Sequence, residues 1–377
     1  MIDQKELTVE LKKKAKQLGF PLVGVTNPEP PAHLDFFQEW CAAGYHGTME
    51  WMASPRSLER RSDPRIILPE CESILVLGSP YPKPPEGKLN GRIAAYALNQ
   101  DYHDVLGEKL QILVDFLEEI TGQVIPNRWY TDTGPVLERD LAQRAGLGWI
   151  GKNTLLINQG YGSYFFLAEI LLGIKLKRDP PFSTQHCGDC THCLDACPTG
   201  SLFAPYSLDA NKCISYLTIE YGEMIPLELR PLMKDWIFGC DICQQVCPWN
   251  QSLKENPEII EEFKPREDLI DLDLIDELGL SQGEFSARFK GSPVKRAKRA
   301  GYLRNVALAL GNKKDDAALA DLAAALDDPE PLIRGVAAWS LGEINGEKAR
   351  QFLEIAGENE KDSLVMKEIQ ESLNKIG

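Results

Sequence analysis

The sequence lacks the features that would place the protein in a membrane or outside the cell. Its N-terminus, Met1 to Glu6, has no apolar core of the kind found in export signals. The longest apolar run, residues 164–174, is too short to span a bilayer and contains Glu169. Cysteines in a chain without an export signal should stay reduced, so we expect a cytoplasmic protein with no membrane association.

Positive charge is scarce overall and unevenly placed. The chain has 41 Lys and Arg against 56 Asp and Glu, a net charge of −15, which argues against a protein that coats nucleic acid with its whole surface. Residues 251–284 form an acidic connection with eleven acidic and three basic residues, whereas residues 285–314 hold nine basic residues and no acidic one. The basic stretch is therefore a candidate phosphate-binding surface, with a solvated basic helix face as the alternative.

Cysteine, in contrast, is abundant. Eight of the ten cysteines lie between Cys187 and Cys247. The first part has the spacing C-x2-C-x2-C-x3-C-P, the bacterial pattern for [4Fe–4S] clusters, in which the fourth cysteine ligates the other cluster. The second part, C-x2-C-x3-C-P, has three cysteines, and the lone Cys213 can supply the missing thiolate. The expected ligand sets are Cys187, Cys190, Cys193 and Cys247 for one cluster, and Cys197, Cys213, Cys240 and Cys243 for the other.

Other uses of these cysteines fit the spacing less well. Structural zinc sites usually combine two separated C-x2-C pairs, and disulfide frameworks belong to small secreted chains. His186 and His192 flank the motif and are expected to be polar loop residues and not ligands. Cys41 and Cys71 stand apart from it and are expected to be buried small apolar residues.

The order of the predicted elements indicates an α+β protein. Apolar strands near residues 21–26 and 73–78 alternate with an amphipathic helix at 5–19 and with a helix whose apolar stripe runs from Leu106 to Ile120. This alternation predicts an α/β domain over residues 1–180.

The rest of the chain is predicted to form two further domains. Residues 181–250 would be a ferredoxin-like domain with two [4Fe–4S] clusters, and the acidic connection 251–284 follows it. The similar segments 301–311 and 332–342 indicate HEAT-like helical repeats over residues 285–377. Such a repeat scaffold would present the basic stretch on an extended surface.

Two short segments between the strands have local signals of their own. Pro135 favours the first turn of a helix, so Asp132 or Thr133 is expected near its N-cap. The glycines of residues 145–153 permit close approach of another backbone segment. Their spacing is neither G-x-G-x-x-G nor a P-loop, so we expect no nucleotide site there.

Along nearly its whole length the sequence resembles the epoxyqueuosine reductases. The matching segments are Asp101 to Asp104, Asp132-Thr-Gly through Glu138-Arg139, the glycine stretch with Lys152-Asn153, the two cysteine motifs and the HEAT-like tail. The resemblance implies reduction of epoxyqueuosine to queuosine at the wobble position of tRNA, the last step of queuosine biosynthesis. It also implies a base-off cobalamin fed by two [4Fe–4S] clusters, a corrin-binding domain similar to that of reductive dehalogenases, and a low-potential electron donor. The cobalamin rests on the resemblance alone, because the sequence contains no D-x-H-x-x-G motif; we further expect a monomer.

The resemblance also assigns roles to single residues. Asp132 matches the proton donor, whose pKa burial against the corrin would have to raise. Ala94 matches a position near the cobalt where some relatives have a cysteine, so a cysteine axial ligand is excluded here. The residues implied to line the corrin are Arg61, Ala94, Asp132, Arg139, Leu156, Leu167, Ser215, Cys240, Asp241, Ile242 and Cys243. Those expected to bind tRNA phosphates are Lys295, Arg296, Lys298, Arg299, Arg304 and Arg334.

Two other functions remain open at this point. A corrinoid reductase of the reductive dehalogenase type would share the corrin and the clusters, but it needs no basic tail and is usually exported. A cobalamin-free ferredoxin-type electron carrier would use only residues 180–250 and would leave the N-terminal part without a purpose. Binding of tRNA would distinguish an epoxyqueuosine reductase from the first alternative, and corrin content would distinguish it from the second.

Overall fold

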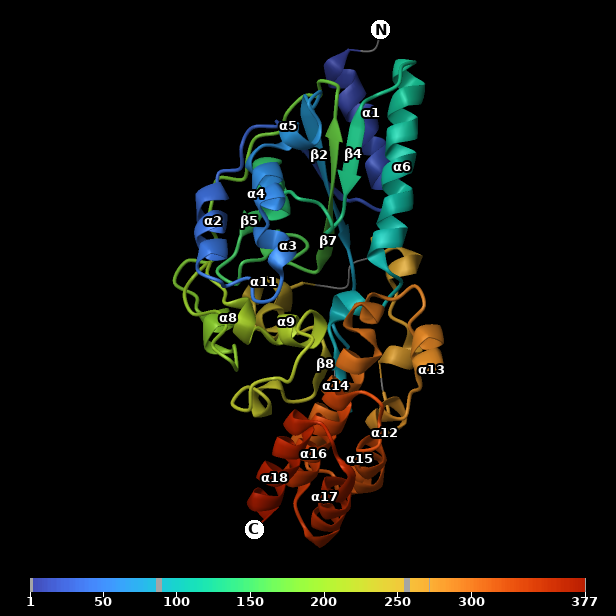
Figure 1. Ribbon diagram of the computed structural model, residues 1–377. Helices are drawn as coiled ribbons and strands as arrows, with labels where there is room; N and C mark the ends of the chain where they lie inside the picture. The colour runs from blue at the N-terminus through green and yellow to red at the C-terminus, as the bar shows by residue number, and fades with distance from the viewer. Residues whose placement is uncertain (1–2, 86–89, 254–257, 271, 377) are drawn as a thin grey trace. The chain divides into compact units, whose positions relative to one another are not determined.

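The computed structural model describes residues 3–85, 90–253, 258–270 and 272–376, so part of the acidic connection lies outside the described residues (Figure 1). The chain forms two compact units. The first comprises Met1–Lys83, Asn99–Asn211 and Ile242–Lys264, and the second Pro84–Leu98, Lys212–Asp241 and Pro265–Gly377. The cysteine-rich segment contributes to both units, and the predicted domain boundaries at residues 180, 250 and 284 stay predictions.

The first unit contains a sheet, several helices and the first cysteine motif. Its longer helices are α1 (Gln4–Gln17), α2 (Leu34–Ala42), α4 (Pro55–Ser62), α6 (Tyr102–Thr121) and α7 (Glu138–Arg144). Its single-turn helices are α3 (Glu50–Ala53), α5 (Pro64–Ile67), α8 (His192–Asp195), α10 (Ile242–Gln245) and α11 (Pro248–Gln251). Its strands are β1 (Leu22–Thr26), β2 (Ser73–Pro80), β4 (Asn127–Tyr130), β5 (Trp149–Ile150), β6 (Leu156–Ile157) and β7 (Phe165–Leu172).

The main sheet has the strand order β1-β2-β7-β4, and each neighbouring pair is antiparallel. The predicted strands at 21–26 and 73–78 are confirmed. The predicted α/β class is wrong for this region, because that class has a mainly parallel sheet. An alternation of helices and strands does not fix strand direction, since a long connection can return the chain either way.

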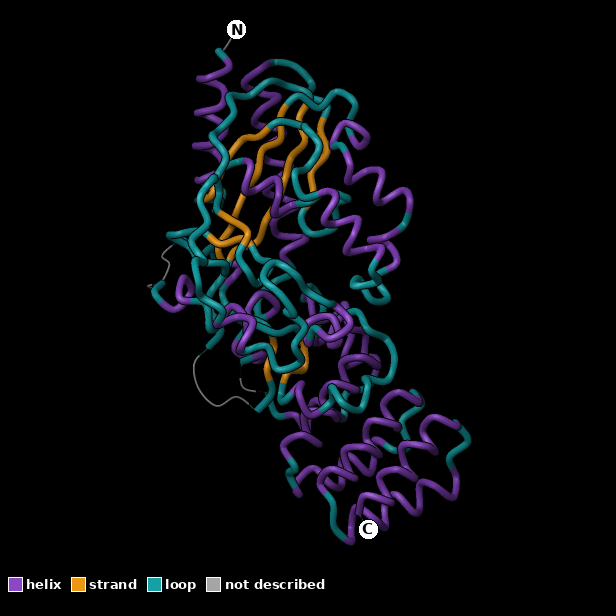
Figure 2. The backbone as a smooth tube through the Cα atoms, turned by 90° about the vertical axis from the view of Figure 1, so that its left-hand side faces the viewer, coloured by secondary structure: helices purple, strands orange, loops and turns teal. Residues whose placement is uncertain are grey.

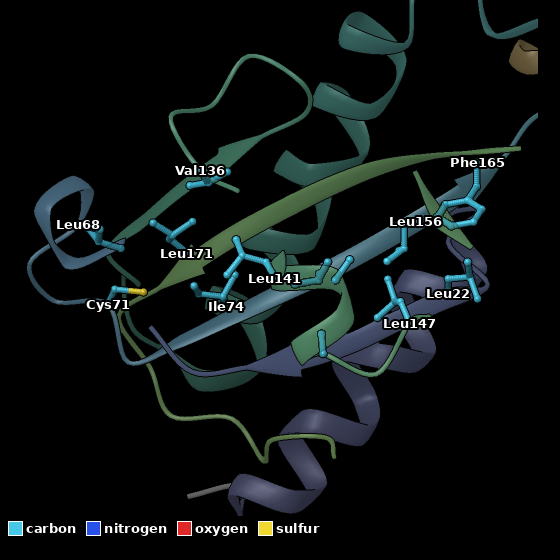
Figure 3. Packing of buried hydrophobic residues seen from close by; sticks show 13 residues of the cluster. Leu22, Leu68, Cys71, Ile74, Val136, Leu141, Leu147, Leu156, Phe165 and Leu171 are labelled. Carbon is cyan, nitrogen blue, oxygen red and sulfur yellow. The ribbon is translucent and has the colours of Figure 1, made fainter. Parts of the chain in front are cut away.

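Helix α7 and the sheet enclose a buried apolar cluster (Figure 3). The cluster includes Leu22 of β1, Ile74 of β2, Leu171 of β7 and Leu141 of α7. Phe165, Leu167 and Leu171 of β7 all belong to it or pack against it. Side chains alternate along a strand, so Glu169 points to the same α7-covered face of the sheet.

Helix α7 begins later than the sequence predicts. Its first residue is Glu138 and its N-cap is Leu137, which makes no side-chain capping hydrogen bond. Pro135 therefore lies before the helix, and the expectation that Asp132 or Thr133 caps it is wrong. The backbone of Asp132 adopts a left-handed conformation, φ 58°, which reverses the chain before the helix can start.

Two glycines allow the close backbone approaches that hold this region together. A Cβ atom on Gly24 of β1 would lie 2.0 Å from the carbonyl oxygen of Ala145, at the end of α7. A Cβ atom on Gly148 would lie 2.1 Å from the carbonyl oxygen of Ile157 in β6. The prediction of close backbone approach in the glycine stretch is thus confirmed, and it serves packing within the unit.

The second unit is mainly helical. Its longer helices are α13 (Gln282–Arg288), α14 (Lys298–Lys313), α15 (Leu319–Ala325), α16 (Pro331–Ile344), α17 (Glu347–Asn359) and α18 (Ser363–Ile376). Its short elements are β3 (Arg92–Ile93), α9 (Ile214–Ile219), β8 (Trp236–Phe238) and α12 (Leu274–Leu278). Helices α14, α16 and α18 pack in series and α15 and α17 pack against them, which is the predicted paired-helix repeat (Figure 2). Within the described residues, no helix is long and apolar enough to cross a membrane.

Candidate functional site

The site is built around Asp132, which lies in the turn between β4 and α7. A left-handed φ of 58° is uncommon for a residue other than glycine and must be held in place by its surroundings. The backbone N–H of Asp132 donates a hydrogen bond to Oε1 of Glu138, at 2.7 Å. The hydroxyl of Thr131 donates to the carbonyl oxygen of Leu167 in β7, at 2.9 Å. The turn is thus fixed on both sides of Asp132.

The Asp132 carboxylate faces the start of α6. Its Oδ2 accepts a hydrogen bond from the hydroxyl of Tyr102, at 2.7 Å, and lies 3.7 Å from Nε2 of His103. The Tyr102 ring stacks on the Phe166 ring, with 4.4 Å between ring centroids, and this contact fixes the hydroxyl. The Asp132 side chain nevertheless keeps 65% of its surface exposed, so a substrate can reach the carboxylate.

Asp101 holds the His103 ring. One Asp101 carboxylate oxygen accepts from the backbone N–H of His103 and lies 2.7 Å from the ring Nδ1, which leaves Nε2 toward Asp132. Burial acts to lower the pKa of His103, but the hydrogen bond to Asp101 and the nearby Asp132 carboxylate raise it to about 9. At neutral pH His103 therefore carries a proton.

The proton is thus held on His103 and not on Asp132. Desolvation by neighbouring groups acts to raise the pKa of Asp132, yet the ion pair with His103 and the hydrogen bond from Tyr102 outweigh it and lower that pKa below its usual value. The sequence-based expectation concerns burial of Asp132 against the corrin and stays a prediction; in the protein alone the pKa of Asp132 is lowered. The ion pair with His103 is the physical reason.

Two further carboxyl groups lie near Asp132. Burial, and then the charge of Asp132, raise the pKa of Glu138 to about 8. Glu169 is fully buried, and neither of its carboxylate oxygens has a hydrogen-bond partner among the described residues. Burial raises its pKa well above the usual value, with the charges of Glu138 and Asp132 adding to the effect. At neutral pH Asp132 is the ionised member of this group of three carboxyls.

Two arginines border these carboxyl groups. The Arg61 side chain is buried, donates to Ser57 and lies over the Phe37 ring, 5.4 Å from its centroid. The Arg139 guanidinium donates to the carbonyl oxygen of Thr154. Arg61 and Arg139 are thus held by protein groups and add positive charge beside Glu138.

A second site in the first unit is formed by cysteines. Cys187, Cys190, Cys193 and Cys247 line one cavity of about 280 Å³. The structure therefore brings together the four thiols that the sequence predicts for one cluster. The Lys152 ammonium group fixes the loop by donating to the carbonyl oxygens of Gly188 and Cys190, at 2.6 and 3.0 Å.

The chemistry of these four thiols suits an iron–sulfur cluster. Burial raises the pKa of Cys193 to about 11 and also raises the pKa of Cys247. Buried thiols deprotonate readily only when a bound cation offsets the cost, and iron provides that charge. His186 and His192 also line the cavity, but the His186 ring packs against Trp149 and contacts the Thr184 hydroxyl at 2.9 Å.

The remaining predicted ligands fall in different units. Cys197 and Cys243 belong to the first unit, and Cys213 and Cys240 belong to the second. The second ligand set therefore stays a prediction. The residues implied to line a corrin divide in the same way: Arg61, Asp132, Arg139, Leu156, Leu167, Ile242 and Cys243 lie in the first unit, and Ala94, Ser215, Cys240 and Asp241 lie in the second.

The structure changes the list of candidate tRNA-binding residues. Arg304 is fully buried, and its guanidinium donates to the carbonyl oxygens of Leu217, Tyr221 and Glu223. Its assignment to a phosphate-binding surface is wrong, because no phosphate can reach it.

The other arginines of this set form ion pairs inside the second unit. Their partners are Glu220 for Arg296, Asp328 for Arg299 and Glu360 for Arg334. Lys295 and Lys298 are exposed and are the stronger candidates for phosphate contact.

Sequence reasoning missed the partners of Asp132. Tyr102, His103 and Glu138 lie in segments that match the family, but no role was assigned to them. The only signal was their position in these segments, because the sequence does not show that the start of α6 faces the turn before α7. Glu169 gave a clearer signal, since an acidic residue in the middle of an apolar run is costly to bury.

Comparisons with known proteins show what the chain as a whole is similar to. Residues 61–133 match the family described as "Epoxyqueuosine reductase QueG, DUF1730", residues 186–250 match the "4Fe-4S double cluster binding domain", and residues 298–374 match "HEAT repeats". The second match supports two iron–sulfur clusters. A curated epoxyqueuosine reductase from Pseudomonas aeruginosa is 40% identical over 350 residues, which cover 90% of this chain and 95% of the relative.

Solved structures give the same result. An epoxyqueuosine reductase bound to an epoxyqueuosine-modified tRNA-Tyr stem loop is 34% identical, with a TM-score of 0.91 and coverage of 98% of both chains. The Bacillus subtilis epoxyqueuosine reductase, described with its catalytic aspartate loop swung out of the active site, is 34% identical, with a TM-score of 0.89 and coverage of 98% of this chain and 99% of that one. The likeness to a reductive dehalogenase, with a TM-score of 0.39, is too weak to support the expected similarity. The chain belongs to the epoxyqueuosine reductase family of oxidoreductases.

Proposed function

We propose that this protein reduces epoxyqueuosine to queuosine in the anticodon of tRNA, the last step of queuosine biosynthesis, in the cytoplasm. The observation that carries the proposal is the exposed Asp132 carboxylate, held by Tyr102 and next to protonated His103, in a member of this family. Conversion of an epoxide to an alkene breaks two carbon–oxygen bonds and takes up two electrons and two protons. The oxygen leaves as water.

The side chains supply the protons of this reaction. Because the proton is held on His103 at rest, His103 Nε2 first passes it to the Asp132 carboxylate, and the Asp132 carboxyl group then delivers it to the departing oxygen. His103 takes up the second proton from solvent, and the same two transfers release the oxygen as water. The Tyr102 hydroxyl keeps the carboxylate oriented through both transfers. His103 stays charged at neutral pH because Asp101 holds its other ring nitrogen.

The electrons must come from bound cofactors, because these side chains are not reductants. Cobalamin, held in part by Arg61 and Arg139 and by backbone groups of Leu156 and Leu167, would supply low-potential reducing chemistry at the epoxide. The two cysteine sets would bind [4Fe–4S] clusters that pass single electrons from a low-potential donor. The cavity that contains Cys187, Cys190, Cys193 and Cys247 supports the first of these clusters.

Anaerobic reconstitution with iron, sulfide and cobalamin tests the function. The optical spectrum of the purified protein should show base-off cobalamin, and the reduced protein should convert epoxyqueuosine in an anticodon stem loop to queuosine, detected by nucleoside mass spectrometry. A protein that binds cobalamin but leaves the epoxide intact would overturn the proposed reaction. A protein that reduces the epoxide without cobalamin would overturn the proposed cofactor.

Exposed lysines of the second unit are expected to contact tRNA phosphates. Reversal of Lys295 and Lys298 to Glu should weaken binding of a substrate stem loop. It should also reduce the slope of log affinity against log salt by about two, because each phosphate contact contributes about one counterion. Filter binding across a salt series measures both quantities.

The matched control for this variant reverses the exposed Lys348 and Lys361, which changes the net charge by the same amount. Equal losses in the two variants would mean that total charge, and not this surface, determines binding. Unaltered affinity and slope after reversal of Lys295 and Lys298 would place the tRNA on another surface.

A further inference from the structure

We propose that Glu138 is a positioning residue that holds the Asp132 turn in its reactive conformation, an inference that rests on the role proposed above for Asp132. The hydrogen bond from the Asp132 N–H to Glu138 Oε1, at 2.7 Å, joins the two ends of the turn. Glu138 is itself anchored as the first residue of α7, which packs against the sheet. The side chain thus links a loop residue to a rigid element.

The geometry of Asp132 makes such a link necessary. A left-handed φ of 58° is unfavourable for aspartate. The turn is also held by the bond from the Thr133 N–H to the Thr131 carbonyl oxygen and by the Thr131 hydroxyl on Leu167, but neither of these bonds acts on the N–H of Asp132. The side-chain partners of Asp132, Tyr102 and His103, act on the carboxylate and not on the backbone. Glu138 therefore controls where the carboxylate lies, although its own side chain contacts neither reacting atom.

The surroundings of Glu138 suit a fixed hydrogen-bond acceptor. Arg139 on α7, Arg61 on α4, Glu169 on β7 and Asp132 all act on its carboxyl group, and burial with the charge of Asp132 keeps it largely protonated at neutral pH. A protonated carboxyl offers one acceptor oxygen and one donor group, which is also what a glutamine amide offers. Glutamine should therefore reproduce the link.

Two substitutions separate the reach of this side chain from its charge. Glu138→Gln keeps the length and the acceptor oxygen but removes the ionisable group. Glu138→Asp keeps the ionisable group but shortens the arm by one methylene, so the carboxyl should no longer reach the Asp132 N–H. Glu169→Gln is the matched control, since it changes a neighbouring carboxyl to an amide, and within the described residues that carboxyl makes no hydrogen bond to the turn.

Hydrogen–deuterium exchange of a peptide covering residues 131–137, read by mass spectrometry on the full-length reconstituted protein, tests the link without using activity. Exchange at the Asp132 amide should be roughly tenfold faster in Glu138→Asp, the effect of losing one hydrogen bond of about 1.4 kcal/mol. In Glu138→Gln and Glu169→Gln it should stay within about threefold of the unsubstituted protein. Turnover should follow the same order, with a lower kcat and an unchanged KM for the tRNA stem loop in Glu138→Asp.

Each other outcome overturns the inference. Equal losses of turnover in Glu138→Gln and Glu138→Asp with unchanged exchange would make Glu138 a proton-transfer group. Unchanged exchange in Glu138→Asp would mean that the turn is held by other contacts. Because the exchange measurement needs no substrate, failure of the proposed reaction would leave this test intact; thermal unfolding of each variant checks that all fold equally.

Discussion

Replacement of Asp132 by asparagine is expected to lower turnover by roughly two to four decades, the usual contribution of general acid catalysis. The amide keeps the shape of the side chain and can accept the hydrogen bond from Tyr102, but it cannot release a proton. Asparagine also tolerates a left-handed φ better than most residues, so the turn should persist. Single-turnover assays with a prereduced protein and the modified stem loop measure the effect.

The pH dependence of turnover provides the control for this substitution. The pKa of His103 is raised to about 9, so its proton is present below that pH and is lost above it. Turnover of the unsubstituted protein should therefore fall as pH rises through about 9. The residual activity of the Asp132→Asn variant should not follow this titration, since the variant has no carboxylate to which His103 could transfer its proton. Near-normal turnover in the variant with unchanged cluster and cobalamin content would mean that another group donates the proton.

The sequence identified the candidate catalytic residue, but it did not predict the conformation of the turn that holds this residue. Asp132 was found through the family match, but Pro135 suggested a helix that would have made Asp132 a cap. The structure starts α7 at Glu138, because the left-handed residue and the bends after it belong to a turn that also packs on β7. Local propensity cannot detect this turn, since its conformation depends on contacts with residues far away in the sequence.

The same distinction applies to charge. The basic stretch 285–314 is visible in the sequence, but its exposure is not. Arg304 lies in α14, whose residues from Gly301 to Gly311 are all buried, so its guanidinium is used to bind carbonyl groups of the second unit. The neighbouring residues Val306, Ala307 and Leu308 indicate that the helix is buried, because a helix with apolar residues on every side is an interior helix.

The cysteine spacing was the most informative sequence feature, because a cluster constrains its ligands within a few residues of one another. Three thiols at a step of three residues must lie on one loop, and the structure places Cys187, Cys190 and Cys193 around one cavity. The fourth expected ligand, Cys247, comes from a motif more than fifty positions away, and it lines the same cavity, where the ferredoxin pattern would place it. The second set depends on Cys213, which has no neighbouring cysteine in the sequence.

Loss of either ligand set should abolish turnover, because electrons must pass along both clusters to reach the substrate. The anaerobically reconstituted protein should hold about eight iron atoms, the content of two cubane clusters. Cys190→Ala should lower this to about four, and Cys213→Ala should do the same if Cys213 ligates the second cluster. Iron analysis and the electron paramagnetic resonance spectrum of the reduced protein would identify which cluster is missing in each variant.

Cys71→Ala is the matched control for these substitutions, since Cys71 is buried in the apolar cluster of the sheet and lies outside both motifs. It should retain about eight iron atoms and turnover close to that of the unsubstituted protein. If the unsubstituted protein held about four iron atoms and Cys213→Ala changed nothing, the chain would carry one cluster and Cys213 would be a structural residue. Stoichiometric zinc in place of iron would contradict the iron–sulfur assignment, because zinc held by four thiolates transfers no electrons and the proposed reduction would have no source for them.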